Sequence, residues 1–446
     1  MSYTDEDEPI DLGVRGEDAW RVRRVWVKGN RRTRPDVVAA CVKPVLKART
    51  FDEVLARVAE AAGELKGLGI FKSVNLVLDD LPDDVAAADP SACDLRVELV
   101  EHKLTRIEVK TSTTVGENEP DVQATVGLCN AFGRAETVSV SAQVGASNWR
   151  EHWSSAFSLA FKRPVLGQGP GPRHIEADAT RASHRLPWCA LTQTTHGLAL
   201  RYSLPSHQVS YEASARHVIP ESSAPLALRS HAGHSLKSAV KYVYAHDTRD
   251  DPLTPTTGHA FTSSTELAGL GGDVRFVKQE MAAQLNLPLG KTRCSFNVLA
   301  KAGYLHALDS GSRIVDRFFL GGPGSIRGFQ YNAVGPSHQQ RALGGGAYWA
   351  GSLHLSFPLP LRDVPDFVSG HLFANAGNLR QPTPGRSVAA NVQDLFSADD
   401  VRAAVGAGLV LRTMFGRVEL NLSHPIRKAA TDLVQPFQVG LSVRFL

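Results

Sequence analysis

Apolar and polar residues alternate along most of the chain beyond residue 104. Between residues 137 and 147, valine and alanine take every second position, with serine, threonine, glutamine and glycine between them. The same alternation recurs at 122–128, 198–204 and 438–445. Successive side chains of a strand point to opposite faces, so this pattern predicts strands with one apolar and one polar face.

This alternation fits two architectures. In a soluble sandwich the apolar faces form a shared core and the polar faces meet water. In a membrane barrel the apolar face meets lipid and the polar face lines a wet lumen. Membrane strands need about 9–11 residues each, so residues 104–446 accommodate sixteen strands, although twelve or eighteen also fit.

The chain before residue 104 shows helical spacing between shorter strand patterns. The sequence predicts strands at 20–28, 70–78 and 94–100, and helices that begin near Pro35 and at 51–68. The order strand, helix, helix, strand, strand predicts one small α+β domain at 19–103. Residues 1–18 hold seven acids and a single base, Arg15, and are expected to form an acidic disordered tail.

Composition narrows the class of protein. The chain has 446 residues and a net charge of +4, which is too balanced to indicate a nucleic-acid partner. No run of 18 mostly apolar residues predicts a membrane-spanning helix. The five cysteines form no C-x-x-C pair, which disfavours a disulfide scaffold or zinc ribbon. The N-terminus lacks the apolar core of a secretory signal and an arginine-rich transit peptide, so we expect the chain to start in a cytosol.

Motifs for nucleotide or metal chemistry are not supported. The glycine-rich stretch 321–329 matches neither G-x-G-x-x-G nor G-x-S-x-G, and 290–292 lacks the earlier glycine of a phosphate loop. His231 and His234 have no carboxylate or thiol cluster beside them in sequence. We therefore expect no cofactor, no metal and no enzymatic activity.

Several ordered stretches resemble one family, the outer-membrane insertases that join POTRA domains to a sixteen-stranded barrel. They are 130–136 (NAFGRAE), 247–258 (DTRDDP with Pro255 and Gly258), 318–329 (FFLGG leading to SIRGF), 343–348 (LGGGAY), 351–360 (GSLHLSFPLP), 406–409 (GAGL) and 419–425 (ELNLSHP). The resemblance implies a mainly β fold, a 16-stranded transmembrane antiparallel β-barrel preceded by one small α+β POTRA domain. The barrel is expected to occupy 104–446.

In this family the loop that carries the S-I-R-G-F motif folds back into the barrel and docks on its inner wall. The resemblance assigns the motif to Ser325, Ile326, Arg327, Gly328 and Phe329. It assigns the docking wall to His354, Phe373, Asn375 and Gly377, which alternation also turns inward. Bacterial members typically carry acids at two of these wall positions. Here His354 and Asn375 predict neutral acceptors for Arg327, a weaker class of bond than an ionic pair and a pattern similar to the mitochondrial branch. The motif either stabilises the barrel or acts directly in insertion.

The C-terminus resembles the signal carried by the last strand of mitochondrial barrel precursors. Gln438, Gly440, Val443 and Phe445 match its polar, glycine, hydrophobic, hydrophobic spacing, although any final barrel strand alternates. The family resemblance places a lateral seam between the first strand, 105–113, and the last, 436–445. Ile107 and Val109 are the seam residues expected on the first strand.

The resemblance implies a protein that inserts and folds β-barrel precursors in the mitochondrial outer membrane. Its expected partners are those precursors, accessory subunits of an assembly complex, intermembrane-space chaperones and the lipid bilayer, with no nucleic acid. The N-terminal domain is expected in the intermembrane space. A protein-translocating channel of the same superfamily, for example from a plastid outer envelope, and a soluble β-rich enzyme are the alternatives.

Overall fold

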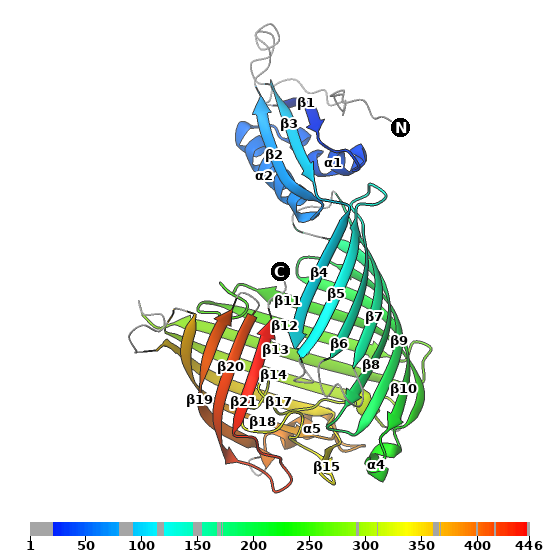
Figure 1. Cartoon of the computed structure of the whole chain (residues 1–446), viewed down its shortest axis with the longest axis vertical. Coiled ribbons are helices and arrows are strands. Elements are labelled where there is room, and N and C mark those ends of the chain that lie inside the picture. The colour runs from blue at the N-terminus through cyan, green and yellow to red at the C-terminus, as the bar shows by residue number, and fades with distance from the viewer. Residues whose placement is uncertain are drawn as a thin grey trace.

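The chain folds as a small α/β domain joined to a large barrel, as Figure 1 shows for the computed structural model. The structure describes residues 21–79, 92–113, 120–145, 154–166, 171, 173–290, 294–309, 311–359, 365, 367–397, 400–413 and 416–443. The predicted acidic tail, 1–18, lies outside these residues. In the described part of the chain, no helix is both long and apolar enough to cross a bilayer.

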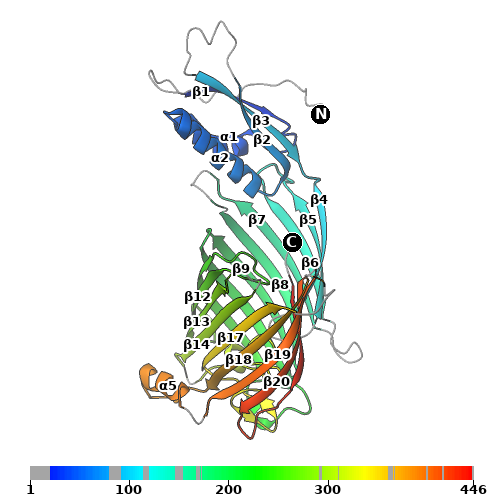
Figure 2. The same ribbon diagram turned by 90° about the vertical axis from the view of Figure 1, so that its left-hand side faces the viewer.

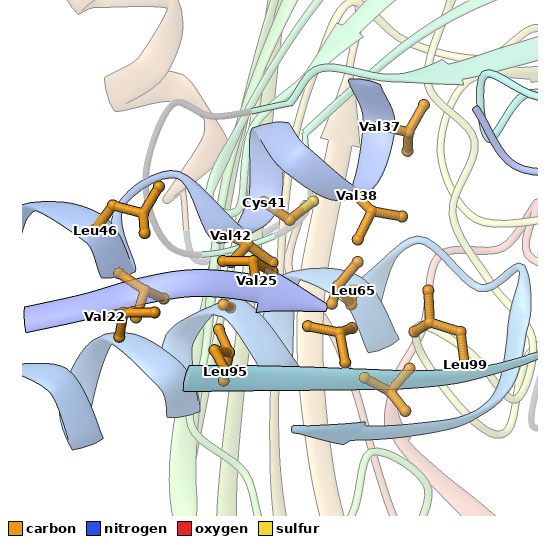
Figure 3. Close-up of a cluster of buried hydrophobic side chains, with 14 of the residues drawn as sticks. Val22, Val25, Val37, Val38, Cys41, Val42, Leu46, Leu65, Leu95 and Leu99 are labelled. Carbon is orange, nitrogen blue, oxygen red and sulfur yellow. The ribbon is translucent and has the colours of Figure 1, made fainter. Parts of the chain in front are cut away.

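The N-terminal domain packs two helices on one face of a three-stranded sheet. Its elements are β1 (Arg21–Lys28), α1 (Pro35–Val42), the short 3-10 helix η1 (Val45–Lys47), α2 (Phe51–Gly67), β2 (Phe71–Asp79) and β3 (Ala92–Glu101). The central strand β3 runs parallel to β1 and antiparallel to β2. Val25, Val38, Leu65 and Leu95 are fully buried between sheet and helices (Figure 3). The order of elements is the one the sequence predicts.

Sixteen antiparallel strands form the barrel, as the sequence resemblance predicted. They are β4 (Thr105–Thr113), β5 (Pro120–Cys129), β6 (Thr137–Gly145), β7 (Ser155–Pro164), β8 (His174–Leu186), β9 (Leu191–Ser203), β10 (His207–Pro220), β11 (Gly233–Asp247), β12 (Gly258–Ala268), β13 (Phe276–Pro288), β14 (Ser295–Ala307), β17 (Ala347–Pro358), β18 (Val368–Arg380), β19 (Arg402–Thr413), β20 (Gly416–Arg427) and β21 (Phe437–Val443). Every ladder joins strands that follow one another in the barrel (Figures 1 and 2).

Alternation sets which side chains face out. Phe157, Leu159 and Phe161 on β7, like Leu353 on β17 and Leu372 on β18, are exposed on the outer wall. The residues between them point into the lumen and include many serines, asparagines and histidines. An apolar outer face with a polar interior is the arrangement of a membrane barrel, not that of a sandwich with a shared core.

The sheet has two ends, β4 and β21. Within the described residues no hydrogen-bonded ladder joins them, although Cα atoms of the two strands approach within 8 Å. The outward side chains of β4 reflect this missing neighbour. Ile107 is 72% exposed and Val109 is 69% exposed, whereas Val122 and Val126 on the adjacent β5 are 47% and 48% exposed. In the described part of the chain, the first and last strands are therefore neighbours without a ladder between them.

The connection between β14 and β17 is the long one that enters the lumen, and we call residues 311–346 the lid loop. It contains the 3-10 helix η2 (Ile314–Asp316) and the short strands β15 (Ser337–His338) and β16 (Arg341–Ala342). Ile326 and Phe329 near its tip are completely buried. Two further short helices, α4 (Leu226–Arg229) and α5 (Val388–Leu395), lie at the barrel end opposite the N-terminal domain (Figure 1).

The turn between β5 and β6 fixes the N-terminal domain to the barrel. The Arg34 N–H donates to the Gly133 carbonyl over 2.8 Å, and Asn130 Nδ2 donates to Thr33 Oγ1 over 2.8 Å. Thr33 Oγ1 in turn donates to the Glu101 carboxylate over 2.6 Å. Ala135 from the same turn joins the hydrophobic core of the N-terminal domain. The NAFGRAE motif of the sequence is thus the junction between the two parts.

Candidate functional site

The tip of the lid loop is a tight turn that only glycine-rich backbone can make. Gly321, Gly322 and Gly328 have φ values of +118°, +97° and +91°, a region that side chains with a Cβ rarely adopt. A Cβ on Gly328 would lie 3.2 Å from the side chains of Ala404 and Ser423. The Ser325 hydroxyl accepts a hydrogen bond from the Gly321 N–H at 2.9 Å and stabilises the turn. This turn presents Arg327 to the inner wall.

Arg327 is buried in a pocket formed by three barrel strands. Its Nη2 donates to Glu419 Oε2 over 2.8 Å, and its Nη1 donates to His354 Nε2 over 3.3 Å. The guanidinium also lies over the Phe373 ring, 5.0 Å from its centroid. Glu419 is bound a second time by Arg417 Nη2, at 2.8 Å. The contacts therefore join the lid loop to β17, β18 and β20.

Glu419 corrects the sequence prediction that Arg327 is held only by neutral acceptors. The docking pair is ionic, because the acid comes from β20 instead of from the two wall positions considered in the sequence. Its signal was available: Leu420 and Leu422 alternate outward, which turns Glu419 into the lumen as a lone acid. Sequence reasoning applied this parity argument to β17 and β18 but not to β20.

The other predicted wall residues have different roles. Gly377 leaves room for the lid, since a Cβ there would lie 2.6 Å from Ile326 Cδ1. Asn375 is buried and faces inward, but its amide has no hydrogen-bond partner among the described residues, so it does not hold Arg327 as predicted. His354 and Phe373 do contact Arg327. Three of the four predicted wall residues thus meet the lid motif.

The side chain of Gln438 on the last strand binds the backbone of the lid loop. The Gly328 N–H donates to Gln438 Oε1 over 3.0 Å, and Gln438 Nε2 donates to the Phe329 carbonyl over 2.6 Å. Gly440 lies two residues further along the same face of β21. A Cβ on Gly440 would lie 3.2 Å from the Cβ of Pro323 in the lid loop. The sequence named the lid motif and the last strand separately. The structure brings them into direct contact.

The chain after β20 adds a second set of backbone bonds to the same segment of the lid. The Gln330 N–H donates to the Leu433 carbonyl over 2.8 Å, and the Gln435 N–H donates to the Gly328 carbonyl over 3.0 Å. Phe329 also forms a β-bridge with Val434. The lid loop is therefore paired with the approach to the last strand as well as with the strand itself.

The remaining predicted seam residues lie on the two free strands. Ile107 and Val109 point outward from β4, and the backbone of Val443 pairs with Gly416 of β20. Phe445 lies outside the described residues. The hydrogen bonds given above join the lid motif to β21 and to the chain just before it. These contacts place the candidate site on the β21 side of the barrel.

Basic residues of three further strands also hold the lid loop. Arg216 of β10 forms a buried ion pair with Asp316, at 2.8 Å, and Lys278 Nζ donates to the Asp316 carbonyl over 2.9 Å. Lys301 of β14 donates to the Gly324 carbonyl over 3.2 Å. Sequence analysis missed all three basic residues. Their only signal was a charge on the lumen-facing side of an alternating strand.

Metal chemistry finds no support in the geometry. Among the described residues, no three histidine, cysteine or acidic side chains lie close enough together to hold an ion. His234, singled out in the sequence, stacks on His217 of the neighbouring strand with ring centroids 4.0 Å apart.

Comparisons with known proteins agree with this architecture. The family model described as the Omp85 superfamily domain matches residues 130–445. The chain is similar to the "Sorting and assembly machinery component 50 homolog" of Mus musculus and that of Homo sapiens, each 34% identical over 95% of this chain and 90% of the relative. A SAM50-like protein of Schizosaccharomyces pombe is 32% identical, with the same two shares covered.

Solved structures share the fold at low sequence identity. The BamA of Haemophilus ducreyi lacking POTRA domains 1–3 superposes with a TM-score of 0.76, covering 95% of this chain and 84% of that one, at 16% identity. CdiB from Acinetobacter baumannii gives a TM-score of 0.53 at 10% identity, over 94% of this chain and 72% of that one. With the sixteen-stranded barrel and docked lid described above, the chain belongs to the Omp85 superfamily, in the group of the sorting and assembly machinery component 50 homologs.

Proposed function

We propose that this protein inserts and folds β-barrel precursors in the mitochondrial outer membrane, using its seam as a template. The observation that carries the proposal is the pair of free strand edges, β4 and β21, within an otherwise continuous ladder of sixteen strands. The name of the relatives, sorting and assembly machinery, supports the same role. The function needs no bond chemistry, cofactor or metal.

The physical problem is pairing of backbone groups in lipid. A strand in hydrocarbon has no water to bind, so each backbone N–H or C=O left without a hydrogen bond costs on the order of several kcal/mol of free energy. A free barrel edge offers a complete set of partners, and a precursor strand adds to it by β-augmentation. Alternation of the precursor then selects the register, because a slip of one residue would turn its apolar face inward.

The lid loop supports a role in holding the template edge. Gln438 and Gly440 of β21 face the lumen and contact the lid tip, so a docked lid keeps the last strand in place. A precursor strand with the polar-x-glycine spacing of Gln438 and Gly440 could present the same two groups to the lid. The lid loop, with Ile326 and Phe329 buried, also occupies part of the lumen, which favours lateral release over passage of an unfolded chain through it.

The orientation follows from the same role. We assign residues 19–103 as a POTRA domain in the intermembrane space and 104–446 as the integral barrel. Precursors that arrive with intermembrane-space chaperones would meet this domain first, and accessory subunits of the assembly complex would meet the barrel. Arg23 and Arg24 on β1 are exposed and can bias such encounters electrostatically.

A seam crosslink tests the proposal. In a variant without the five native cysteines, one cysteine replaces Val109 on β4 and another replaces Val443 on β21. Insertion of a newly made barrel precursor is followed in isolated mitochondria with the seam oxidised or reduced. We expect insertion to be lost on oxidation and restored on reduction.

The control crosslinks a ladder that is already closed. Val126 on β5 and Val140 on β6 are direct antiparallel partners on the outer wall, so a disulfide there leaves the seam free. Insertion should be unchanged in this variant. Normal insertion through a seam with a verified crosslink would overturn lateral templating and favour a channel through the lumen.

A further inference from the structure

Helix α5 is a short helix that exposes a row of apolar side chains. Its residues Val388 and Val392, with the C-cap Phe396, recur at intervals of four and are 49%, 36% and 62% exposed. Helical geometry places such residues on one face. The buried Asn391 and Leu395 lie on the side of the helix next to this row. The row is therefore left at the surface beside the part of the helix that packs on the barrel.

The helix is fixed to the outer wall of the barrel. Asn378 of β18 is completely buried beneath it and donates from Nδ2 to the Leu395 carbonyl over 2.9 Å. Trp349 of β17 donates from Nε1 to the same carbonyl over 3.0 Å, and its ring stacks on Phe396 at 5.5 Å. Arg380 donates to the Asp394 carbonyl over 2.9 Å. Three wall residues thus hold the C-terminal end of α5 outside the barrel (Figure 2).

The wall on which α5 sits is the surface that meets lipid. Trp349 is shared between the helix and an apolar groove of about 660 Å³ that continues along the outer wall over Met281, Leu353 and Ala376. Trp349 lies two residues after the start of β17, the strand end that follows the lid loop. Aromatic residues at a barrel rim occupy the boundary between headgroups and hydrocarbon. The exposed face of α5 therefore continues the lipid-facing surface at that boundary.

We propose that α5 is a membrane-interface helix, with Val388, Val392 and Phe396 inserted between phospholipid headgroups of the leaflet at this rim. A short helix with one apolar face, lying in the interface plane, binds a bilayer in this way. The ends of the helix carry ion pairs that stay in water, Arg386 with Asp394 and Arg380 with Asp400. The helix anchors one side of the barrel rim, at β17 and β18, four and three strands away from β21 by ladder order.

Site-directed fluorescence tests the proposal in the full chain. A variant without native cysteines receives a single cysteine at Val392, labelled with an environment-sensitive fluorophore, in phosphatidylcholine–phosphatidylethanolamine liposomes. The matched control is Gln393, the adjacent exposed residue turned about 100° around the helix. Leu353 on the wall and Arg57 on α2 supply the lipid and water references.

We expect a blue-shifted emission at Val392, with iodide quenching several-fold weaker than at Gln393 and strong quenching by a nitroxide on the lipid headgroup. Iodide quenching at Val392 equal to that at Arg57 would overturn the proposal. Protection of Val392 from iodide in native membranes, but not in liposomes that contain no other protein, would also overturn it. That result would assign the face to a protein partner. A second label at Val388 repeats the measurement on the first turn of the helix. Strong iodide quenching at Val392 but not at Val388 would indicate that the Val392 substitution unfolds the helix locally, whereas strong quenching at both sites would overturn the proposal.

Discussion

The two free edges of the barrel sheet are held by different parts of the molecule. The β21 edge is held from inside, where Gln438 binds the lid backbone and Arg327 fixes the lid to Glu419. The β4 edge is held at its junction with the N-terminal domain. Its chain follows the N-terminal domain directly, and the neighbouring β5–β6 turn is bonded to Thr33. Each edge has an anchor that the other lacks.

This difference teaches that the two sets of contacts can be removed separately, because they involve different residues. Loss of the Arg327–Glu419 pair leaves the Asn130–Thr33 hydrogen bond at the junction in place. Substitutions can therefore be chosen that weaken one set and spare the other.

The largest expected effect is that of Arg327→Ala. This change leaves Glu419 buried with only Arg417 to balance it, and loss of one partner of a buried ion pair costs about 3–5 kcal/mol. Hydrogen exchange should accelerate strongly in the lid tip and in β21, with β4 unchanged. Arg386→Ala, which removes an exposed pair, is the control and should change neither edge.

Gln438→Ala should have the next largest effect. It removes two hydrogen bonds between β21 and the lid, at about 1 kcal/mol each, so exchange in β21 should rise by roughly tenfold or more. Gln438→Glu keeps the acceptor for the Gly328 N–H but loses the donor to Phe329. Its exchange rate should fall between wild type and the alanine variant. Equal rates in all three proteins would show that the lid does not hold the last strand.

Asn130→Ala tests the other edge. It breaks the bond to Thr33 at the junction, a loss of about 1–3 kcal/mol because buried polar groups remain unpaired. Spin labels on α2 and on the outer wall should report a broader distance distribution between the N-terminal domain and the barrel. Exchange in β21 should stay at the wild-type rate. An accelerated β21 would mean that the two anchors are coupled.

The smallest effect is expected from pH. Burial raises the pKa of Glu101, but hydrogen bonds from Thr33 and Arg32 outweigh it and leave the pKa below its usual value. The resulting stabilisation is present above the unfolded pKa of about 4.3 and is lost as pH falls through the folded pKa. The same spin-label distances should therefore broaden only below about pH 4, and Glu101→Gln should remove that dependence.

The sequence predicted local features better than long-range contacts. Period-two alternation is a local property, so the strands and the inward direction of His354 and Phe373 could be derived from neighbouring residues. Glu419 is separated from Arg327 by 92 residues and Gln438 from Gly328 by 110, and their pairing depends on closure of the barrel. Alternation predicts which residues face the lumen. It does not predict how far along the barrel axis each residue lies or which residues face it across the lumen.

The α5 helix was missed for a different reason. Its eight residues lie in a connection between strands, and a helix this short gives barely two turns of periodicity. Trp349 and Asn378, which fix it to the wall, belong to alternating strands and read as ordinary barrel residues. The unexpected amide at an outward position of β18 was the available signal.

The ladder order also bears on how this protein completes its own fold. Every strand pair in the barrel joins strands that follow one another along the chain, so each strand can add to the one before it across a connection no longer than the lid loop. A pairing between the first and last strands would close a loop of more than 300 residues, which carries the largest loop-closure entropy cost in the barrel. Loop entropy alone therefore makes the seam the last strand pairing to form.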